Sequence, residues 1–324
     1  MFKNTLSIVG VTGSGKTEFA LHIAEQLLSE QRFDHVVLIS ADSRQVYKGL
    51  EVISGADIPE SYVQQNVESG DVALYPYYVS PQKTISLHGQ SIVEPNTQWS
   101  LAHFKELVES VRKQFESTRT AFLIVGGTGL YHRWLYQDEA WQPVEPDIAL
   151  RQELSEASVE DLQSRLRAES AQWFSALNQS DQLNPRRLIR AIERARVGNS
   201  PEKRQQQSHN ISWIGLEDDP TKRAERIQNR VVKRLRSGAI LEVENLTRMF
   251  SDQRLPAWST LGVPQIQQFL RAEITENELI AAWSLAEQQY CKRQLTWLKR
   301  EPITWVTQTD RENDRTILEI LAKQ

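Results

Sequence analysis

The clearest chemical signature near the start of the chain is a pair of glycines followed by a lysine and a threonine. Gly10 and Gly15 are separated by four residues, and Lys16 and Thr17 follow at once, in the Gly-x4-Gly-Lys-Thr pattern of a phosphate-binding loop. Such glycines let backbone N–H groups turn toward a phosphate, while the lysine supplies positive charge and the threonine hydroxyl can bind Mg²⁺. We therefore expect a diphosphate or triphosphate to bind here, with Thr17 as the metal ligand. The predicted phosphate-binding residues of this loop are Gly10, Thr12, Gly13, Ser14, Gly15, Lys16 and Thr17.

Four consecutive hydrogen-bonding side chains follow the second apolar stretch of the chain, residues 36–40. Such a stretch predicts a parallel strand buried on both faces, and open α/β sheets bind ligands just beyond the carboxyl ends of their strands. The aspartate in this cluster could instead only cap the following helix, but four such side chains in a row exceed what a cap requires. We expect them to face a ligand opposite the phosphates, and they are Asp42, Ser43, Arg44 and Gln45.

A further glycine-rich turn follows the apolar run at residues 121–125. It reads Gly126-Gly127-Thr128-Gly129, in which paired glycines allow a close backbone approach to a ligand and Thr128 can hydrogen-bond to it. No aspartate ends this run, although many phosphate-loop hydrolases have one there to act around Mg²⁺. This difference argues against a nucleotide-driven motor or switch.

A cluster of arginines lies in a predicted helix that begins near Pro185. Arg187, Arg190 and Arg194 are spaced by three and four residues, so they share one face of that helix. The face is either an ordinary solvated basic surface or a contact for the phosphate backbone of a nucleic acid.

A second basic cluster lies in the predicted helix 221–236. Arg223, Arg226 and Arg230 form one stripe along it, within a segment that carries seven basic residues between positions 222 and 236. This charge density is too high for a routine solvated face. We therefore expect at least one of these arginines to reach the phosphates as an electrostatic clamp.

The elements that must position these groups follow from the hydrophobic pattern. Short apolar runs predict buried strands, and apolar residues recurring every three or four positions predict amphipathic helices. Strands are expected at residues 6–9, 36–40, 121–125, 211–216 and 303–306, an edge strand interrupted by proline at 72–79, and helices at 18–28, 100–116, 221–236 and 276–299. This order predicts an α/β fold, a P-loop NTPase-like parallel sheet flanked by helices. A small helical insertion domain at 137–207 divides a core formed by residues 1–136 and 208–324.

The composition narrows the class of protein further. The 324 residues include 38 basic and 42 acidic side chains, a net charge of −4, so the chain as a whole does not indicate a nucleic-acid binder. Cys291 is the only cysteine, which excludes an internal disulfide and a cysteine-cluster zinc site and fits a reducing cytoplasm. No apolar run approaches the length of a membrane span, and the N-terminus lacks a signal-peptide pattern. We expect a cytoplasmic protein that does not bind membranes.

Four motifs, in this order, resemble those of the bacterial tRNA dimethylallyltransferase family, whose members are also called tRNA isopentenyltransferases. They are Gly-Val-Thr-Gly-Ser-Gly-Lys-Thr at 10–17, Ser-Ala-Asp-Ser-Arg-Gln-Val-Tyr-Lys-Gly at 40–49, Val-Gly-Gly-Thr-Gly-Leu-Tyr at 125–131 and Arg-Gln-Leu-Thr-Trp-Leu-Lys at 293–299. The second motif followed by the third is far more specific than the phosphate loop alone. The sequence is similar to this family over about residues 5–306 and is identified as a somewhat divergent member.

This resemblance implies an activity and its partners. Members of the family transfer a dimethylallyl group from dimethylallyl diphosphate to the exocyclic N6 of the adenosine just 3′ of the anticodon in tRNA. The resemblance also implies Mg²⁺ as cofactor and a helical insertion that clasps the anticodon stem. The expected partners are therefore tRNA and dimethylallyl diphosphate, and the protein is expected to be a monomer.

Roles for individual residues are carried over position by position. The resemblance implies that Asp42 is the catalytic base, that Lys16, Thr128 and Arg226 are also catalytic, and that Arg230 helps to bind the diphosphate. Trp297, in the last motif, either packs in the core or contacts a base. The residues implied to bind tRNA are Asp42, Ser43, Arg44, Gln45, Arg186, Arg187 and Arg190.

The chemistry is consistent with these roles. The adenine N6 amine is not basic, so it becomes a useful nucleophile only when its proton is removed as the new bond forms, which a nearby carboxylate such as Asp42 can do. Charge collects on the departing diphosphate, where Lys16, the loop N–H groups, Mg²⁺ and Arg226 can stabilise it. Because the adenine must leave its stack to reach a buried cleft, base flipping is implied.

The sequence departs from the family pattern at several places. The phosphate loop has Val-Thr-Gly at 11–13 where the family has Pro-Thr-Ala, and the usual Gly-Thr-x-Lys-Pro is missing after Gly49. The His-His-Leu-x-Asp motif is reduced to Ser-Leu-His-Gly-Gln at 86–90. The Arg-x-x-Gly-Tyr-(Lys/Arg)-Gln motif becomes Ser-Thr-Leu-Gly-Val-Pro-Gln at 259–265, with the loss of two basic residues and a tyrosine.

Three other functions remain open at this point. A related enzyme could prenylate free adenine nucleotides, although a long basic insertion is not needed for that acceptor. A P-loop nucleoside or metabolite kinase shares the phosphate loop and a carboxylate after the second strand. A weakly active RNA-binding relative would explain the altered motifs, but Lys16, Thr17, Asp42 and Thr128 are all present.

Overall fold

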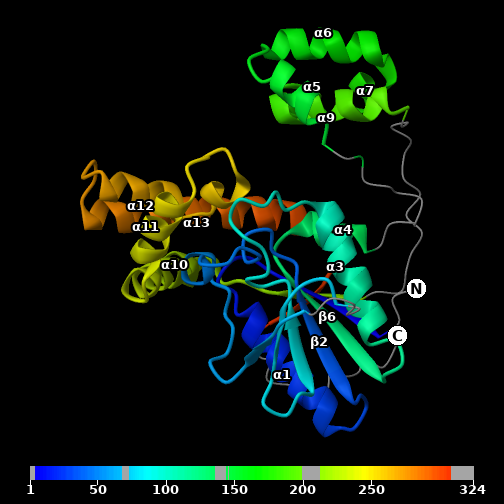
Figure 1. Cartoon of the computed structure of the whole chain (residues 1–324), viewed down its shortest axis with the longest axis vertical. Coiled ribbons are helices and arrows are strands. Elements are labelled where there is room, and N and C mark those ends of the chain that lie inside the picture. The colour runs from blue at the N-terminus through cyan, green and yellow to red at the C-terminus, as the bar shows by residue number, and fades with distance from the viewer. Residues whose placement is uncertain (1–3, 68–72, 136–143, 145, 199–211, 308–324) are drawn as a thin grey trace. The chain divides into compact units, whose positions relative to one another are not determined.

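A computed structural model describes residues 4–67, 73–135, 144, 146–198 and 212–307 of the chain. The chain packs into two compact units (Figure 1). The larger comprises residues 1–136 and 208–324, and the smaller comprises residues 137–207.

An eight-stranded sheet forms the centre of the larger unit, in the order β3-β4-β5-β2-β6-β1-β7-β8. In this spatial order, the last six strands, β5-β2-β6-β1-β7-β8, run parallel, whereas β4 pairs antiparallel with both β3 and β5. β1 lies between β6 and β7, and all five of its residues are buried, as expected for a strand covered on both faces. The strands are β1 (Thr5–Val9), β2 (His35–Ser40), β3 (Val63–Gln65), β4 (Tyr77–Val79), β5 (Ile85–His88), β6 (Thr120–Gly126), β7 (Ser212–Leu216) and β8 (Thr304–Val306).

Helices cover both faces of this sheet. α1 packs against the face that carries Leu6 and Ile8. Side chains alternate along a strand, so Ser7 faces the other way, and there its hydroxyl contacts His132 of α4. α3 packs on α4 at this second face (Figure 1). The helices of the larger unit are α1 (Lys16–Ser29), α2 (Glu51–Ser54), α3 (Leu101–Gln114), α4 (Gly129–Trp134), α10 (Pro220–Arg236), α11 (Ala239–Met249), α12 (Val263–Leu270) and α13 (Glu276–Leu298), with a short 3₁₀ helix, η1 (Pro256–Ser259).

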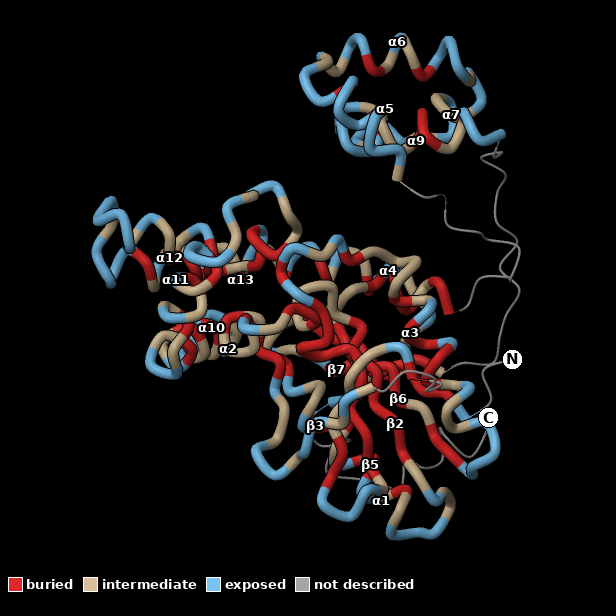
Figure 2. Tube along the Cα trace, in the orientation of Figure 1, coloured by how far each residue is buried: buried red, intermediate tan, exposed pale blue. Residues whose placement is uncertain are grey.

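The smaller unit is a helical domain with a hydrophobic core of its own. Leucines at 150, 154, 162, 166 and 188, together with Ile192, are at most 4% exposed, and Figure 2 shows buried positions on α6 and α9. Each of the five helices in its described residues begins at a polar residue whose side chain accepts a backbone N–H of the first turn. They are α5 (Ile148–Glu153), α6 (Val159–Glu169), α7 (Ala171–Ala176), α8 (Gln179–Gln182) and α9 (Pro185–Arg196).

The prediction of an α/β fold with a mostly parallel sheet and flanking helices is confirmed. Two local predictions were wrong. The strand expected at 72–79 begins only after Pro76, at Tyr77, and it lies inside the sheet because β3 occupies the edge; Val72 is outside the described residues. The strand Ile85–His88 was not predicted at all. The strand expected from Ile211 begins at Ser212, and Ile211 is likewise not described.

The topology brings the predicted functional loops together. The carboxyl ends of parallel β1, β2, β6 and β7 meet at one edge of the sheet, and the phosphate loop, residues 41–49, residues 127–128 and residues 217–219 follow them directly. Within the described ranges, no helix has both the length and the apolar character needed to cross a membrane.

Candidate active site

The phosphate loop connects β1 to α1 with its lysine folded back across it. Gly13 and Gly15 have φ angles of 75° and 81°, in the left-handed region that favours glycine, which lets the loop turn tightly at both positions. Lys16 Nζ donates a hydrogen bond to the carbonyl oxygen of Val11 at 2.7 Å, and this bond closes the loop. The lysine thus already lies inside the loop.

The environment of Lys16 weakens its proton affinity. Burial and the nearby guanidinium of Arg230 lower the pKa of its ammonium to about 8, while the carboxylate of Asp42 acts in the opposite direction. An incoming anion would satisfy this partly buried positive charge. The electrostatics therefore favour a diphosphate in this loop.

Arginines of α10 form a second side of the phosphate site. A Cβ placed on Gly13 would lie 3.8 Å from Cδ of Arg230 and 3.9 Å from Nε of Arg226, so both side chains reach the loop. Nε of Arg226 is buried and has no hydrogen-bond partner among the described residues, and it is a donor that an oxyanion could satisfy. The basic stripe of this helix therefore lies beside the phosphate loop, and the contact of at least one of its arginines with the phosphates stays a prediction.

A residue that sequence reasoning missed orients this stripe. Asp218 follows β7, its side chain is only 1% exposed, and it forms ion pairs with both Arg223 and Arg226. Burial of a carboxylate is favourable only when charge partners compensate for it, and the two guanidinium groups are those partners. The signal in the sequence was a run of three acidic residues, 217–219, just before the basic helix.

The loop after β2 carries the predicted catalytic base. An oxygen of Asp42 accepts the backbone N–H of Arg44 at 2.8 Å, which fixes the carboxylate in a local turn. The next helix, α2, begins only at Glu51, so Asp42 does not cap it and that alternative is wrong. Asp42 influences the pKa of Lys16, Tyr131 and Tyr290, so it lies near all three side chains.

Gln45 is held inside the protein by both ends of its amide. Ser40 Oγ donates to Gln45 Oε1 at 2.8 Å, and Gln45 Nε2 donates to the carbonyl oxygen of Gly55 at 2.8 Å. This bracing fixes the 42–45 segment against the end of β2 and the end of α2. Direct contact between Gln45 and tRNA stays a prediction, as do those of Ser43 and Arg44.

Helix α2, whose end anchors Gln45, is itself capped by a residue from a distant helix. α2 has no side-chain cap of its own, and the carboxylate of Glu242, from α11, accepts the N–H groups of Val52 and Ile53 at 2.8 Å each. Burial raises the pKa of Glu242 to about 7, although the two N–H bonds act against that rise. Nothing in the local sequence around α2 indicated this contact.

The turn after β6 forms the third wall of the site. The N–H of Thr128 donates to the carbonyl oxygen of Ala41 at 3.1 Å, and a Cβ on Gly126 would overlap the backbone of Ala41. The glycine thus permits close contact between the ends of β2 and β6. Burial together with the negative charge of Asp42 raises the pKa of the phenol of Tyr290, a residue of α13, and the side chain of Thr128 acts in the opposite direction.

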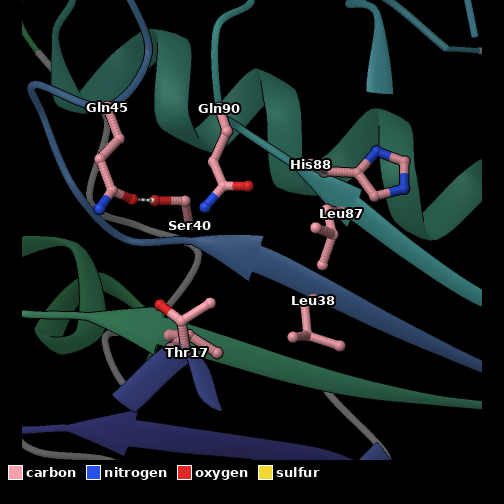
Figure 3. Close-up of a pocket in the computed structure, with 8 residues that line it drawn as sticks. Thr17, Leu38, Ser40, Gln45, Leu87, His88 and Gln90 are labelled. Atoms are coloured by element: carbon pink, nitrogen blue, oxygen red, sulfur yellow. Dashed lines mark hydrogen bonds between the residues drawn. The ribbon is translucent and has the colours of Figure 1, made fainter. Parts of the chain in front are cut away.

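A small cavity lies just beyond the first turn of α1 (Figure 3). Its volume of about 20 Å³ suffices for one water molecule. Figure 3 shows Ser40, Gln45 and Gln90 close together around one part of it, with Leu38 and Leu87 further along the strands. Thr17, the predicted metal ligand, also lines it.

Trp297 has a packing role in this structure. A Cβ on Gly129 would overlap its ring, the guanidinium of Arg133 lies 4.9 Å from the ring centroid, and Trp213 stacks on it at 6.0 Å. Of the two alternatives left open by the sequence, the contacts favour packing beneath the turn after β6.

The arginines of the helical unit differ in their surroundings. Arg186 and Arg187 are exposed, and Arg187 lies 3.8 Å from Asp181 with 68% of its side chain exposed. Arg190 donates to Glu193 at 2.6 Å and to the carbonyl oxygen of Val144 at 2.5 Å. Arg190 therefore helps to hold its own domain together, which the sequence analysis did not anticipate, and its contact with tRNA is still a prediction.

The protein side chains fit a weakly held Mg²⁺. In the part of the chain that the structure describes, no group of three or more His, Cys, Asp and Glu side chains could hold a metal ion. Mg²⁺ needs no such cage, because it keeps several waters and is commonly bound through substrate phosphates and one or two protein oxygens. The hydroxyl of Thr17 beside the phosphate loop suits that mode of binding.

Comparison with known proteins gives a consistent family of matches. The family model described as IPP transferase matches residues 45–301. The tRNA dimethylallyltransferase of Acetivibrio thermocellus is 29% identical, over 98% of this chain and 96% of the relative, and that of a Cyanothece species is 30% identical, over 94% and 92%. The crystal structure of the full-length tRNA isopentenylpyrophosphate transferase from Bacillus halodurans superimposes with a TM-score of 0.64 at 26% identity, and the match covers 100% of this chain and 98% of that one.

Proposed function

Because the chain belongs to the IPP transferase family, we propose that it transfers a dimethylallyl group from dimethylallyl diphosphate to N6 of the adenosine just 3′ of the anticodon in tRNA. The observation that carries this proposal is the pairing of two opposed chemistries at one edge of the sheet. A cationic loop that suits a diphosphate stands beside a carboxylate that suits an amine, and Asp42 is close enough to affect the pKa of Lys16.

The donor half of the reaction requires a stabilised leaving group. As the allylic C–O bond breaks, its electron pair goes to the diphosphate oxygen. Lys16, the loop N–H groups, Arg226 and Arg230 are positioned to bind that charge more tightly than they bind the intact donor. We propose that Thr17 helps to hold Mg²⁺ on the diphosphate, which would neutralise part of the same charge.

The acceptor half requires removal of one proton. The N6 lone pair forms the new C–N bond, and the amine proton passes to the carboxylate of Asp42 as that bond forms. The hydrogen bond from the N–H of Arg44 holds this carboxylate in place. Thr128 and Tyr290 lie nearby and can orient the adenine of the acceptor. The adenine would reach Asp42 only after it has left the anticodon stack.

The helical unit gives the protein a second, separate surface for RNA. Its Arg186 and Arg187 are exposed, and Arg187 is held only loosely by Asp181 at 3.8 Å, whereas Arg190 is held by Glu193 at 2.6 Å. The two exposed arginines suit contacts with a phosphate backbone. We propose that this unit contacts the anticodon stem. We further propose that the protein acts as a monomer in the cytoplasm, where its acceptor is found.

Transfer of label distinguishes this proposal from the alternatives. The protein is incubated with Mg²⁺, labelled dimethylallyl diphosphate and one acceptor at a time, which is unmodified tRNA, AMP or ADP. ATP consumption is followed in parallel. Label in tRNA at the proposed adenosine is expected. Label only in AMP or ADP would indicate a nucleotide prenyltransferase, and ATP consumption with no label transfer would indicate a kinase.

Substitution of the proposed base separates catalysis from binding. Asp42→Asn keeps the shape and the acceptor oxygen of the side chain but cannot take a proton, so transfer should fall by at least about 10²-fold. Affinity for dimethylallyl diphosphate should stay within about twofold of wild type, measured by calorimetry without tRNA. A large loss of donor affinity would contradict the role assigned to Asp42.

A further inference from the structure

One face of α13 contacts several walls of the site at once. Gln294 lies four positions after Tyr290 and three positions after Cys291, so it neighbours both side chains along one side of the helix. Cys291 Sγ lies 3.7 Å from the carbonyl oxygen of Thr12, and the ring of Trp297, near the end of this helix, packs against Gly129. The same helix therefore contacts both the phosphate loop and the turn after β6.

Gln294 makes the most specific of these contacts. Its Oε1 accepts the backbone N–H of Thr12 in the phosphate loop at 2.9 Å, and its Nε2 donates to the carbonyl oxygen of Gly127 at 3.3 Å. The side chain is buried, with a residue exposure of 6%. A single amide thus joins two glycine-rich loops that belong to different strands.

The fit around this amide is close. A Cβ on Gly127 would overlap Nε2 of Gln294 and would lie 3.3 Å from the carbonyl oxygen of Gly10. Gly127 therefore leaves room both for the glutamine and for the start of the phosphate loop. Gln294 fills the space between the loops and pairs one backbone donor and one backbone acceptor that are partly buried there.

We infer that Gln294 is a positioning residue, which sets the phosphate loop against the turn that carries Thr128 and so fixes the distance between the donor and acceptor halves of the site. The amide meets both demands at once, because the Thr12 N–H requires an acceptor and the Gly127 carbonyl requires a donor. A carboxylate would supply the first and repel the second. An apolar side chain would supply neither and would leave both backbone groups unpaired.

Hydrogen exchange of the full-length protein tests this inference without any substrate. In Gln294→Leu, amide exchange should accelerate in peptides that cover residues 10–17 and 126–129 and should stay unchanged in the helical unit. Gln294→Glu should keep residues 10–17 protected and loosen only residues 126–129, since it retains the acceptor alone. The matched control is Gln289→Leu, the same substitution at an exposed position of the same helix, which should change neither.

Binding and kinetics supply a readout that general destabilisation would not reproduce. Inorganic pyrophosphate with Mg²⁺ is the probe, and Gln294→Leu should weaken its binding about tenfold or more, in line with the loss of one buried backbone contact to the loop. Gln294→Glu should bind pyrophosphate more tightly than Gln294→Leu. In transfer assays the KM for the donor should rise, while the KM for tRNA stays within about twofold of wild type.

Clear results would overturn the inference. Pyrophosphate affinity and exchange at 10–17 that match wild type in Gln294→Leu would show that the loop does not depend on this residue. If Gln294→Leu does not fold, Gln294→Glu decides, and unchanged exchange at 126–129 in that variant would be contradictory. The kinetic measurements rest on the proposed function, but hydrogen exchange and pyrophosphate binding do not. A wild-type protein with no transfer activity would refute the proposed function, and the exchange and binding data would still test the role of Gln294.

Discussion

Affinity for a diphosphate should fall steeply above pH 8, because the phosphate-loop lysine loses its charge there. Burial and the charge of Arg230 lower the pKa of Lys16 to about 8 in the free protein. A bound diphosphate would favour the charged lysine, so the binding reaction must supply the missing proton at higher pH. The perturbation is therefore pH alone, applied to the wild-type protein.

The size of the effect follows from that pKa. The charged fraction of Lys16 is about three quarters at pH 7.5 and about 3% at pH 9.5, so affinity should fall about 25-fold, or about 2 kcal/mol, over this range. A lysine with its ordinary pKa of 10.5 would still be about 90% charged at pH 9.5. The two cases differ by more than tenfold in affinity.

Calorimetric titration with dimethylallyl diphosphate at fixed Mg²⁺, without tRNA, measures this directly. Repeating the titration at pH 8.5 in buffers of different ionisation enthalpy should reveal uptake of about 0.8 proton per diphosphate bound. Neighbouring groups do not titrate in this range, since burial raises the pKa of the Cys291 thiol to about 11 and that of the Tyr290 phenol above its usual value.

Lys16→Arg is the matched control, because arginine keeps its charge throughout this range. Its affinity, whatever its value at pH 7.5, should stay nearly constant up to pH 9.5. A wild-type affinity that changes less than about twofold, with no proton uptake, would refute the reasoning. An equal fall in Lys16→Arg would place the titrating group elsewhere.

Three further experiments test other contacts. Arg226→Ala should lower kcat for transfer by about 10²-fold or more, as loss of a preorganised donor to developing charge usually does, whereas Lys222→Ala, with 80% of its side chain exposed, should stay near wild type in the same assay. Glu242 has a pKa raised from 4.5 to about 7, so the folded state binds more protons than the unfolded state between those values, and stability falls as pH rises through them. Urea unfolding at pH 5 and pH 7 should show that the stability of Glu242→Gln rises by about 1–3 kcal/mol relative to that of wild type over this interval. A difference in stability that is the same at both pH values would contradict the raised pKa. In filter binding, Arg187→Ala should weaken tRNA affinity, and the slope of log affinity against log salt concentration should fall in magnitude by about 1, without loss of thermal stability. Arg190→Ala leaves the buried carboxylate of Glu193 short of a partner and should destabilise the helical unit by about 1–3 kcal/mol. The opposite pattern would reverse these roles.

The parts of the structure that sequence reasoning reached are those with local signals. The phosphate loop and the runs at 36–40 and 121–125 each carry their pattern within a few consecutive residues, and each strand was found within one residue of its predicted bounds. The parallel sheet followed from these runs, because buried parallel strands are continuously apolar. The expectation that polar loops meet at one edge came from the same rule.

β5 was missed because its residues do not look like a strand of the core. Ser86 and His88 are polar yet buried, and they satisfy each other through a contact of 3.0 Å between the imidazole and the hydroxyl. The His88 ring also stacks on Tyr77 at 4.7 Å between centroids. Burial lowers the pKa of His88 to about 3, so the ring stays neutral there. Tertiary partners made this short segment a strand, and no local pattern could predict them.

Residues that hold the site together were missed for a similar reason. Gln294 is 282 positions from Thr12, and Glu242 is 190 positions from Val52, so each contact depends on how remote helices dock. Arg190 differs, because Glu193 follows it by three residues and could have indicated an internal ion pair. The density of arginines alone suggested contact with RNA. Whether a given arginine is available for that contact depends on where the nearest carboxylate lies.

The central place of β1 has a consequence for synthesis on the ribosome. β1 emerges among the first residues, but one of its two neighbours, β7, begins only at Ser212, and the residue that braces its loop is Gln294. At the usual rates of translation, about 5–20 residues per second, the loop waits roughly 15–55 s for that brace. Until β7 emerges, one edge of β1 has no native partner. Nascent chains stalled before α13 should therefore expose the phosphate loop to proteases, and complete chains should protect it.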